Sequence, residues 1–283
     1  MFKSQEHFSI LIVLMVFLVC CAQKKDRVAV SADGVPIHFD VMREGDPTLV
    51  FIHGWSRSRM DWVEQMTAFS KNHRVVSIDL AGHGESGGER EDWSIQAFSQ
   101  DVITVIEKLN LQRVVLIGHS LGAPVAVEAA RRLPDRIVGI VPVDAFQDVE
   151  ETFTQDQIDG ILAPFKSDFV GTYAQGARMM LKDSTQIQKS IEQIAAFSPE
   201  IGIASLERCY QYYSNDLIPA LQEVKVPIRC INSDAIPTNT KAARRYASDF
   251  DFVVMEGVGH EMQNGHPDQF NRLLEGVLVE FER

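Results

Sequence analysis

The chain has 283 residues, of which 45% are hydrophobic and 23% charged, with 18 Gly and 11 Pro. This length suits one large or two small domains, and the composition excludes a disordered or fibrous chain. The formal net charge of −12 gives a surface that repels phosphate backbones, which argues against nucleic acid as a partner.

The N-terminal segment carries a mostly apolar run, Phe8 to Val19, behind Lys3 and ahead of Lys24 and Lys25. A helix that spans a bilayer needs about 20 apolar residues, so a signal peptide is favoured over a permanent membrane anchor for this run. Its length and flanking charges are typical of a signal peptide. The sequence therefore predicts a leader over residues 1–20 and an exported protein.

The residues at the end of this leader, Leu18 to Cys21, resemble the lipoprotein box of bacteria. The resemblance implies a lipid on Cys21 and a place in the bacterial cell envelope. Export without the lipid is the alternative, because Cys20 stands where a Gly, Ala or Ser is usual. The remaining cysteines, Cys209 and Cys230, are expected to be free buried thiols.

Beyond the leader, short apolar runs alternate with amphipathic stretches, which is the rhythm of βαβ units around a mostly parallel sheet. Runs without inside/outside alternation predict strands that helices cover on both faces. The predicted strands are Ile37 to Met42, Thr48 to His53, Val75 to Asp79, Val114 to Gly118, Ile137 to Val143, Ile228 to Asn232 and Phe252 to Met255. Helical spacing predicts a helix over Ile95 to Leu109, with Ser94 as its N-cap.

This rhythm stops between residues 147 and 221, where apolar residues such as Ile158, Ile161 and Leu162 recur at helical intervals. Strand patterning resumes at Ile228. The segment is therefore predicted to be a helical insert that interrupts the sheet.

The motif Gly118-His119-Ser120-Leu121-Gly122 lies between an apolar strand and a helical segment. Gly-x-Ser-x-Gly alone is a weak signal. In a strand–turn–helix context it predicts a nucleophile elbow, in which the glycines remove side chains that would clash around a strained serine. Ser120 is the predicted nucleophile.

A serine hydroxyl needs a general base and a group that orients that base. His260 follows the last predicted strand, and the carboxyl ends of parallel strands are where an open α/β sheet assembles its site. We therefore expect His260 to be the base. Two aspartates follow strands and could orient it: Asp234, which we prefer because it preserves the order Ser, acid, His, and Asp144.

An oxyanion needs two preorganised N–H donors. One is expected from Leu121, directly after the nucleophile, and the other from Trp55 in the loop after an earlier strand. The loop from Asp79 to Ser86 is interpreted as structural, with Asp79 holding backbone amides.

These motifs, His53-Gly54-Trp55, the Asp79 to Ser86 loop, the Gly118 to Gly122 elbow and Gly259-His260, resemble in order and spacing those of the α/β-hydrolase fold superfamily. The resemblance covers nearly all of residues 28–283. It implies a mostly parallel eight-stranded sheet with helices on both faces and a helical cap after strand six. The core would then comprise residues 28–146 and 222–283, and the cap residues 147–221. The family's acid loop reads Gly-x-x-Asp-x-x-Val-Pro, and this chain is one residue short there, which keeps Asp144 in consideration.

Relatives of this superfamily that open epoxides or remove halides use Asp as nucleophile, whereas this chain has Ser120. We therefore expect a serine hydrolase that cleaves small, apolar carboxylic esters through an acyl-enzyme. No phosphate loop or zinc-ligand spacing occurs in the sequence, so neither a cofactor nor a metal is implied. The alternatives are C–C bond hydrolysis or cofactor-free perhydrolysis with the same triad, and a ligand-binding signalling module. Six residues of the insert are candidates for the pocket: Phe153, Phe165, Phe169, Tyr173, Met179 and Met180.

Overall fold

The structure is a computed structural model that describes residues 27–281. The predicted leader, residues 1–20, and Cys21 lie outside the described residues. Within them, none of the helices has the length and hydrophobicity needed to cross a bilayer. Cys209 and Cys230 are both free thiols, as predicted, but only Cys230 is fully buried and Cys209 is half-buried.

Eight strands form one sheet in the order β1-β2-β4-β3-β5-β6-β7-β8. Strands β1 and β2 join the sheet antiparallel, and the other six strands, β3 to β8, run parallel to one another. The mostly parallel sheet is thus confirmed. The strands are β1 (Val28–Val30), β2 (Pro36–Met42), β3 (Thr48–Ile52), β4 (Val75–Ile78), β5 (Val114–His119), β6 (Ile137–Val143), β7 (Ile228–Ser233) and β8 (Phe250–Met255).

The central strands are apolar on both faces because each face packs against helices. In β3, Leu49 and Phe51 belong to one buried cluster, while Val50 and Ile52 belong to the other. Alternate residues of a strand point to opposite faces, so one continuous apolar run serves two cores.

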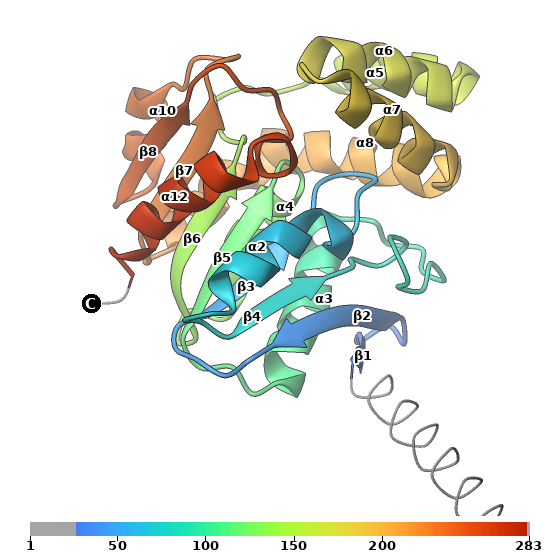
Figure 1. The fold of residues 1–283 in the computed structure, drawn as a ribbon. Coiled ribbons are helices and arrows are strands. Elements are labelled where there is room, and N and C mark those ends of the chain that lie inside the picture. The colour runs from blue at the N-terminus through green and yellow to red at the C-terminus, as the bar shows by residue number, and fades with distance from the viewer. Residues whose placement is uncertain (1–26, 282–283) are drawn as a thin grey trace, which may run out of the picture.

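Helices cover both faces of the sheet, as predicted (Figure 1). One core is closed by α3 (Ile95–Lys108), α4 (Gly122–Arg132), α9 (Leu217–Glu223) and α10 (Thr240–Tyr246). The other is closed by the 3₁₀ turn η1 (Arg59–Trp62), α2 (Val63–Phe69), α11 (Met262–Gly265) and α12 (Pro267–Leu278). Ser94 caps α3 by accepting a hydrogen bond from the amide of Ala97, as its position predicted.

Between β6 and β7 the chain forms the helical insert: α5 (Gln155–Ser167), α6 (Phe169–Met180), α7 (Ser184–Ala195) and α8 (Pro199–Asn215). Each of these helices begins at a side-chain cap, and Thr154 with Gln157 forms a complete capping box. Figure 1 shows α5, α6 and α7 grouped beyond one end of the sheet. The predicted helical insertion after strand six is confirmed.

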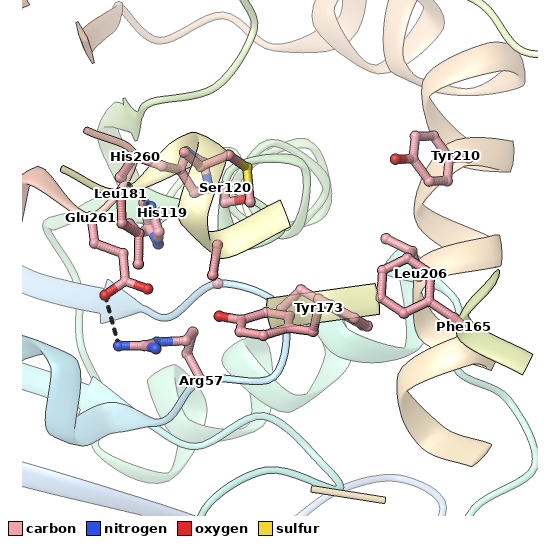
Figure 2. A pocket seen from close by; sticks show the side chains of 14 residues that line it. Arg57, His119, Ser120, Phe165, Tyr173, Leu181, Leu206, Tyr210, His260 and Glu261 are labelled. Carbon is pink, nitrogen blue, oxygen red and sulfur yellow. Dashed lines mark hydrogen bonds and ion pairs between the residues drawn. The ribbon is translucent and has the colours of Figure 1, made fainter. Parts of the chain in front are cut away.

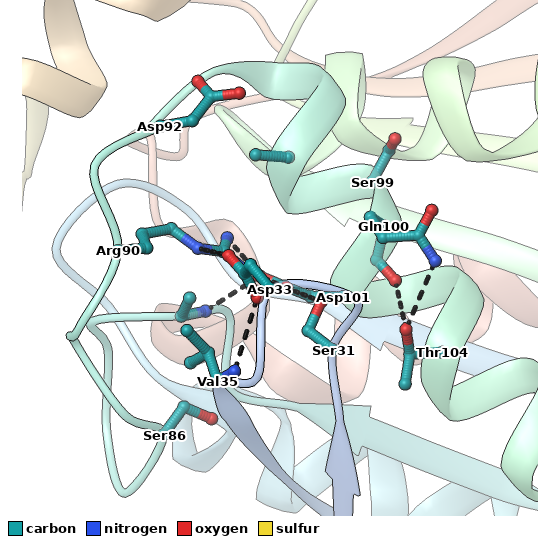
Figure 3. Close-up of polar contacts among 12 residues, drawn as sticks. Ser31, Asp33, Val35, Ser86, Arg90, Asp92, Ser99, Gln100, Asp101 and Thr104 are labelled. Atoms are coloured by element: carbon teal, nitrogen blue, oxygen red, sulfur yellow. Dashed lines mark hydrogen bonds and ion pairs between the residues drawn. The ribbon is translucent and has the colours of Figure 1, made fainter.

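A buried polar network ties the N-terminal hairpin to α3 (Figure 3). Arg90 donates two hydrogen bonds to Asp101, of 2.7 and 3.0 Å, and a third to Asp33. Asp101 also accepts from the Ser31 hydroxyl and the Ala81 amide. Strand β1, which the sequence did not predict, enters the sheet next to these contacts.

Candidate active site

Ser120 occupies the tight turn between β5 and α4, with φ of 50°. Left-handed φ is strained for a serine, and the turn is held by the hydrogen bond from its amide to the Val143 carbonyl, 3.0 Å. A Cβ on Gly118 would lie 2.2 Å from the Gly122 carbonyl oxygen, and a Cβ on Gly122 2.6 Å from that of Ile52. Both glycines are therefore required by close backbone approach.

His260 follows β8, and its Nδ1 lies 2.6 Å from Oδ2 of Asp144. The other carboxylate oxygen of Asp144 accepts a 2.8 Å hydrogen bond from the Ser233 amide. The His260 side chain is 25% exposed and that of Asp144 only 6%. The structure thus assembles an imidazole and an orienting carboxylate beside Ser120.

The carboxylate that contacts His260 belongs to Asp144, and this corrects our preference for Asp234. Asp234 follows β7, is exposed, and makes no hydrogen bond or ion pair with His260. Strand order alone would not select Asp144, because β7 lies between β6 and the β8 strand that precedes His260. Asp144 reaches His260 across the end of β7, whereas Asp234 lies just beyond β7 at an exposed position. The amide of Ser233, just before Asp234, serves to hold Asp144.

The environment of the pair favours a charged carboxylate. Burial would raise the pKa of Asp144, but the hydrogen bonds from His260 and Ser233 and the attraction to His260 lower it below its ordinary value. The His119 ring packs at a tilt of 45° against that of His260 with centroids 4.6 Å apart, and its Nε2 contacts the His260 carbonyl. Burial and the nearby His260 lower the pKa of His119 to about 3, so this second imidazole stays neutral.

The two expected oxyanion donors, Trp55 and Leu121, line one cavity together with Ser120. Within residues 27–281, neither backbone amide donates a hydrogen bond to another backbone or side-chain group. The Trp55 ring is fixed by the insert, since its Nε1 donates to the Gly202 carbonyl at 2.9 Å and its ring packs edge-on against Phe165. An N–H left without a protein partner at this position is available to an oxyanion.

Ser120 lines three cavities. The first, about 240 Å³, is shared with His260 and Arg57; the second, about 400 Å³, contacts His260 and Asp144; the third, about 230 Å³, contacts Trp55 and Leu121. Five of the six insert residues singled out by sequence border these cavities: Phe153, Phe165, Tyr173, Met179 and Met180. Phe169 packs behind them against the Trp55 ring.

The first cavity is apolar on one side and polar on the other (Figure 2). Phe165, Leu206 and Tyr210 form the apolar side. Opposite them, Arg57 and Glu261 form an ion pair of 3.0 Å beneath His260.

This polar side joins two loops of the core to two helices of the insert. Arg57 follows β3 and pairs with Asp61 at 2.6 Å, and it donates to Ser190 of α7 at 3.1 Å. The hydroxyl of Tyr173, on α6, contacts Ser190 in turn.

Burial affects the pKa values of Arg57, Glu261 and Tyr173 on this polar side. Burial would lower the pKa of Arg57, but Asp61 and Glu261 raise it above its ordinary value, so the guanidinium stays charged. Burial, reinforced by Asp61, raises the pKa of Glu261 above its usual range despite the attraction of Arg57. Burial also raises the pKa of Tyr173, whose hydroxyl stays protonated.

No pattern in the sequence indicated Arg57 or Glu261 as residues of the site. Both are residue types that usually lie on the surface, and only the meeting of two loops and α7 buries them. Within residues 27–281, no group of three or more His, Cys, Asp or Glu side chains is arranged to hold a metal ion.

Comparison with known proteins agrees with this geometry. The chain is 25% identical over 248 residues to the dihydrolipoyllysine-residue acetyltransferase component of the acetoin cleaving system of Pseudomonas putida, covering 85% of this chain and 65% of that protein. It is 37% identical over 100 residues to (E)-2-((N-methylformamido)methylene)succinate hydrolase of Acinetobacter baylyi, covering 35% of this chain and 38% of that protein. The chain thus spans less than two thirds of the length of these curated relatives.

Among solved structures, the chain is similar to an esterase from Exiguobacterium antarcticum, with a TM-score of 0.79 and 18% identity over 89% of this chain and 98% of that one. At this identity the likeness shows the fold alone. The profile of the alpha/beta hydrolase family matches residues 49–273, which include the Ser120 elbow, Asp144 and His260. The chain belongs to the alpha/beta hydrolase family.

Proposed function

We propose that this protein is a serine hydrolase that cleaves small, apolar carboxylic esters through an acyl-enzyme. One observation carries the proposal: Ser120, strained at the elbow, shares a cavity with a His260 whose Nδ1 is bonded to the buried carboxylate of Asp144. With Nδ1 directed at the carboxylate, Nε2 is the nitrogen left to accept the serine proton.

The mechanism follows from these roles. Ser120 attacks the ester carbonyl while His260 takes its proton, and Asp144 stabilises the imidazolium that forms. The amides of Trp55 and Leu121 hold the oxyanion. His260 then returns the proton to the departing alcohol. Water, activated by the same imidazole, releases the acid.

Cavity size and lining support a small substrate. The three cavities have volumes of about 240, 400 and 230 Å³, and aromatic or aliphatic side chains dominate their walls. Ligand sites commonly measure about 300–1,000 Å³, so each cavity suits a short acyl or alcohol group.

The test is turnover of p-nitrophenyl acetate by the purified protein and by Ser120→Ala. Loss of the nucleophile is expected to lower kcat by about 10⁴- to 10⁶-fold. Ser167→Ala, at an exposed position at the end of α5, is the matched control and should retain wild-type activity. A fluorophosphonate should label the wild type and the control but not Ser120→Ala.

Two outcomes would contradict the proposal. One is equal turnover by wild type and Ser120→Ala. The other is ligand binding without multiple turnovers, which would instead favour a signalling module whose pocket retains the fold but not the reaction.

A further inference from the structure

The guanidinium of Arg57 is almost fully occupied by its own neighbours. Its Nε and Nη2 donate to Asp61 at 2.6 and 3.2 Å, Nη2 also donates to Glu261 at 3.0 Å, and Nη1 donates to Ser190 at 3.1 Å. An arginine has five N–H donors, so four are engaged within the protein. Arg57 is therefore poorly placed to receive a carboxylate from a substrate.

The local charge leads to the same conclusion. One cation faces two carboxylates, and the side chains of Arg57, Asp61 and Glu261 are only 4, 3 and 7% exposed. The formal sum is −1, in a site where little water screens it. An anionic group that entered this cavity would be repelled by Glu261, the carboxylate that lines the cavity, and would find at most one N–H of Arg57 left to receive it.

The part of an ester that lies here follows from the position of His260. The imidazole must return its proton to the leaving group, and His260 lines the Arg57 cavity together with Ser120. The cavity bordered by Leu121 does not contact His260 and suits the acyl group. The remaining cavity also touches His260, but its lining includes Met179 and Ile236, which are 77 and 58% exposed, and it is the more open of the two cavities beside His260.

We propose that Glu261 masks Arg57 and thereby makes the site select esters of uncharged alcohols or phenols over esters whose leaving group carries a carboxylate. Glu261 is thus a specificity-determining residue for the leaving group. This inference rests on the proposed ester hydrolysis, and it adds a substrate class to it.

The experiment compares two esters of nearly equal size, 4-carbamoylphenyl acetate and 4-carboxyphenyl acetate. Each kcat/KM is divided by the rate of alkaline hydrolysis of the same ester, which removes the difference in leaving-group reactivity. The wild type should favour the amide by about 100-fold or more. Glu261→Gln keeps the shape but removes one charge, and should lower this ratio at least about tenfold, as expected for a unit charge in a poorly screened site.

Two further variants separate charge from packing. Ser190→Ala removes a member of the same network without changing charge, so its ratio should equal that of the wild type. In the double variant Arg57→Gln/Glu261→Gln the negative Asp61 remains, and the ratio should return toward the wild-type value. Circular dichroism and thermal melts check that each variant is folded.

A second measurement needs no variant at Glu261. With the wild type, 4-hydroxybenzamide should inhibit competitively at a concentration at least about tenfold lower than 4-hydroxybenzoate does.

A third comparison tests whether the selection acts on the leaving group or on the acyl group. It uses phenyl hydrogen glutarate, whose carboxylate lies on the acyl side, and the terminal amide of the same ester. Glu261→Gln should leave that second ratio unchanged.

The inference is overturned if the wild type hydrolyses the two acetates at equal normalised rates, or if a folded Glu261→Gln retains the wild-type ratio. A change confined to the glutarate pair also overturns it, because the masked arginine would then face the acyl group. Absence of turnover with every ester overturns the proposed function as well, whereas turnover without discrimination overturns this inference alone.

Discussion

The imidazole of His260 is oriented by one short hydrogen bond, and its partner Asp144 is itself held in an unusual conformation. Asp144 has φ of 46°, and its amide donates to the Ile231 carbonyl at 2.9 Å. The left-handed turn at the end of β6 aims the carboxylate across β7 toward His260. Strain of this kind, held by a neighbouring strand, is characteristic of functional positions.

At this scale we predict unequal effects of the two Asp→Asn substitutions. Asp144→Asn keeps the size but favours the wrong His260 tautomer, and should lower kcat by about 10³- to 10⁴-fold. Asp234→Asn, at the exposed position, should change kcat by less than about twofold. Steady-state kinetics with p-nitrophenyl acetate measures both, and a large loss in Asp234→Asn alone would contradict the assignment.

At the scale of the element, buried ion pairs connect parts of the chain that have few apolar contacts of their own. Strand β1 has only three residues, and the network of Figure 3 holds the loop after it against α3. The loop from Asp79 to Ser86 is held in the same manner: Asp79 accepts from the amides of Arg59 and Glu85 at 2.7 and 2.9 Å. The structural interpretation of that loop is in agreement with these contacts.

Substitution of the two aspartates that pair with Arg90 tests how strongly burial affects the contribution of an ion pair to stability. Asp101→Ala leaves the 2%-exposed Arg90 without its bidentate partner, and should lower the free energy of unfolding by about 3–5 kcal/mol. Asp33→Ala removes the 41%-exposed partner of the same arginine, and should cost less than about 1 kcal/mol. Urea denaturation measures both, and equal losses would show that burial does not decide the strength of these pairs.

At the level of the whole molecule, three histidines are fully buried and stay neutral: His53, His83 and His119. Burial lowers the pKa of His53 to about 4 and those of His83 and His119 to about 3. His53 Nε2 accepts the Leu80 amide at 3.0 Å, so a second proton there would break a buried hydrogen bond. In the unfolded chain each imidazole titrates near about 6.5.

Because the folded pKa values are depressed, the unfolded state binds more protons below about pH 6.5, and stability must fall as the pH falls toward 4. The raised pKa values of Asp101 and Glu261 act in the opposite direction. We therefore expect a net loss of about 1–3 kcal/mol per pH unit between pH 6 and 4.5.

The variant His83→Phe tests the histidine contribution. The native His83 ring lies among Phe98, Phe197 and His53, so a phenyl ring should be accommodated there. Removing one imidazole should reduce the slope by about 1.4 kcal/mol per pH unit. Urea denaturation at several pH values gives both slopes, and identical slopes would contradict the prediction.

Much of the fold was predictable because its signals are local. A continuous apolar run such as Val114–Ile117 indicates a strand covered on both faces, and Ser94 marks a helix start by its own side chain. Strand β1 escaped prediction because three residues are too few for a pattern and its pairing with β2 lies in the tertiary fold.

The residues of the candidate site likewise fall into those with a local signal in the sequence and those without one. The Ser120 elbow could be located from the sequence alone, because its glycines are required by backbone atoms within a few residues or on the adjoining strand. The contact of Asp144 with His260 and the pairing of Glu261 with Arg57 become visible only in the folded chain. Those outcomes depend on which strands are neighbours and on how the insert closes over them, and distances between remote segments are not encoded in any local pattern.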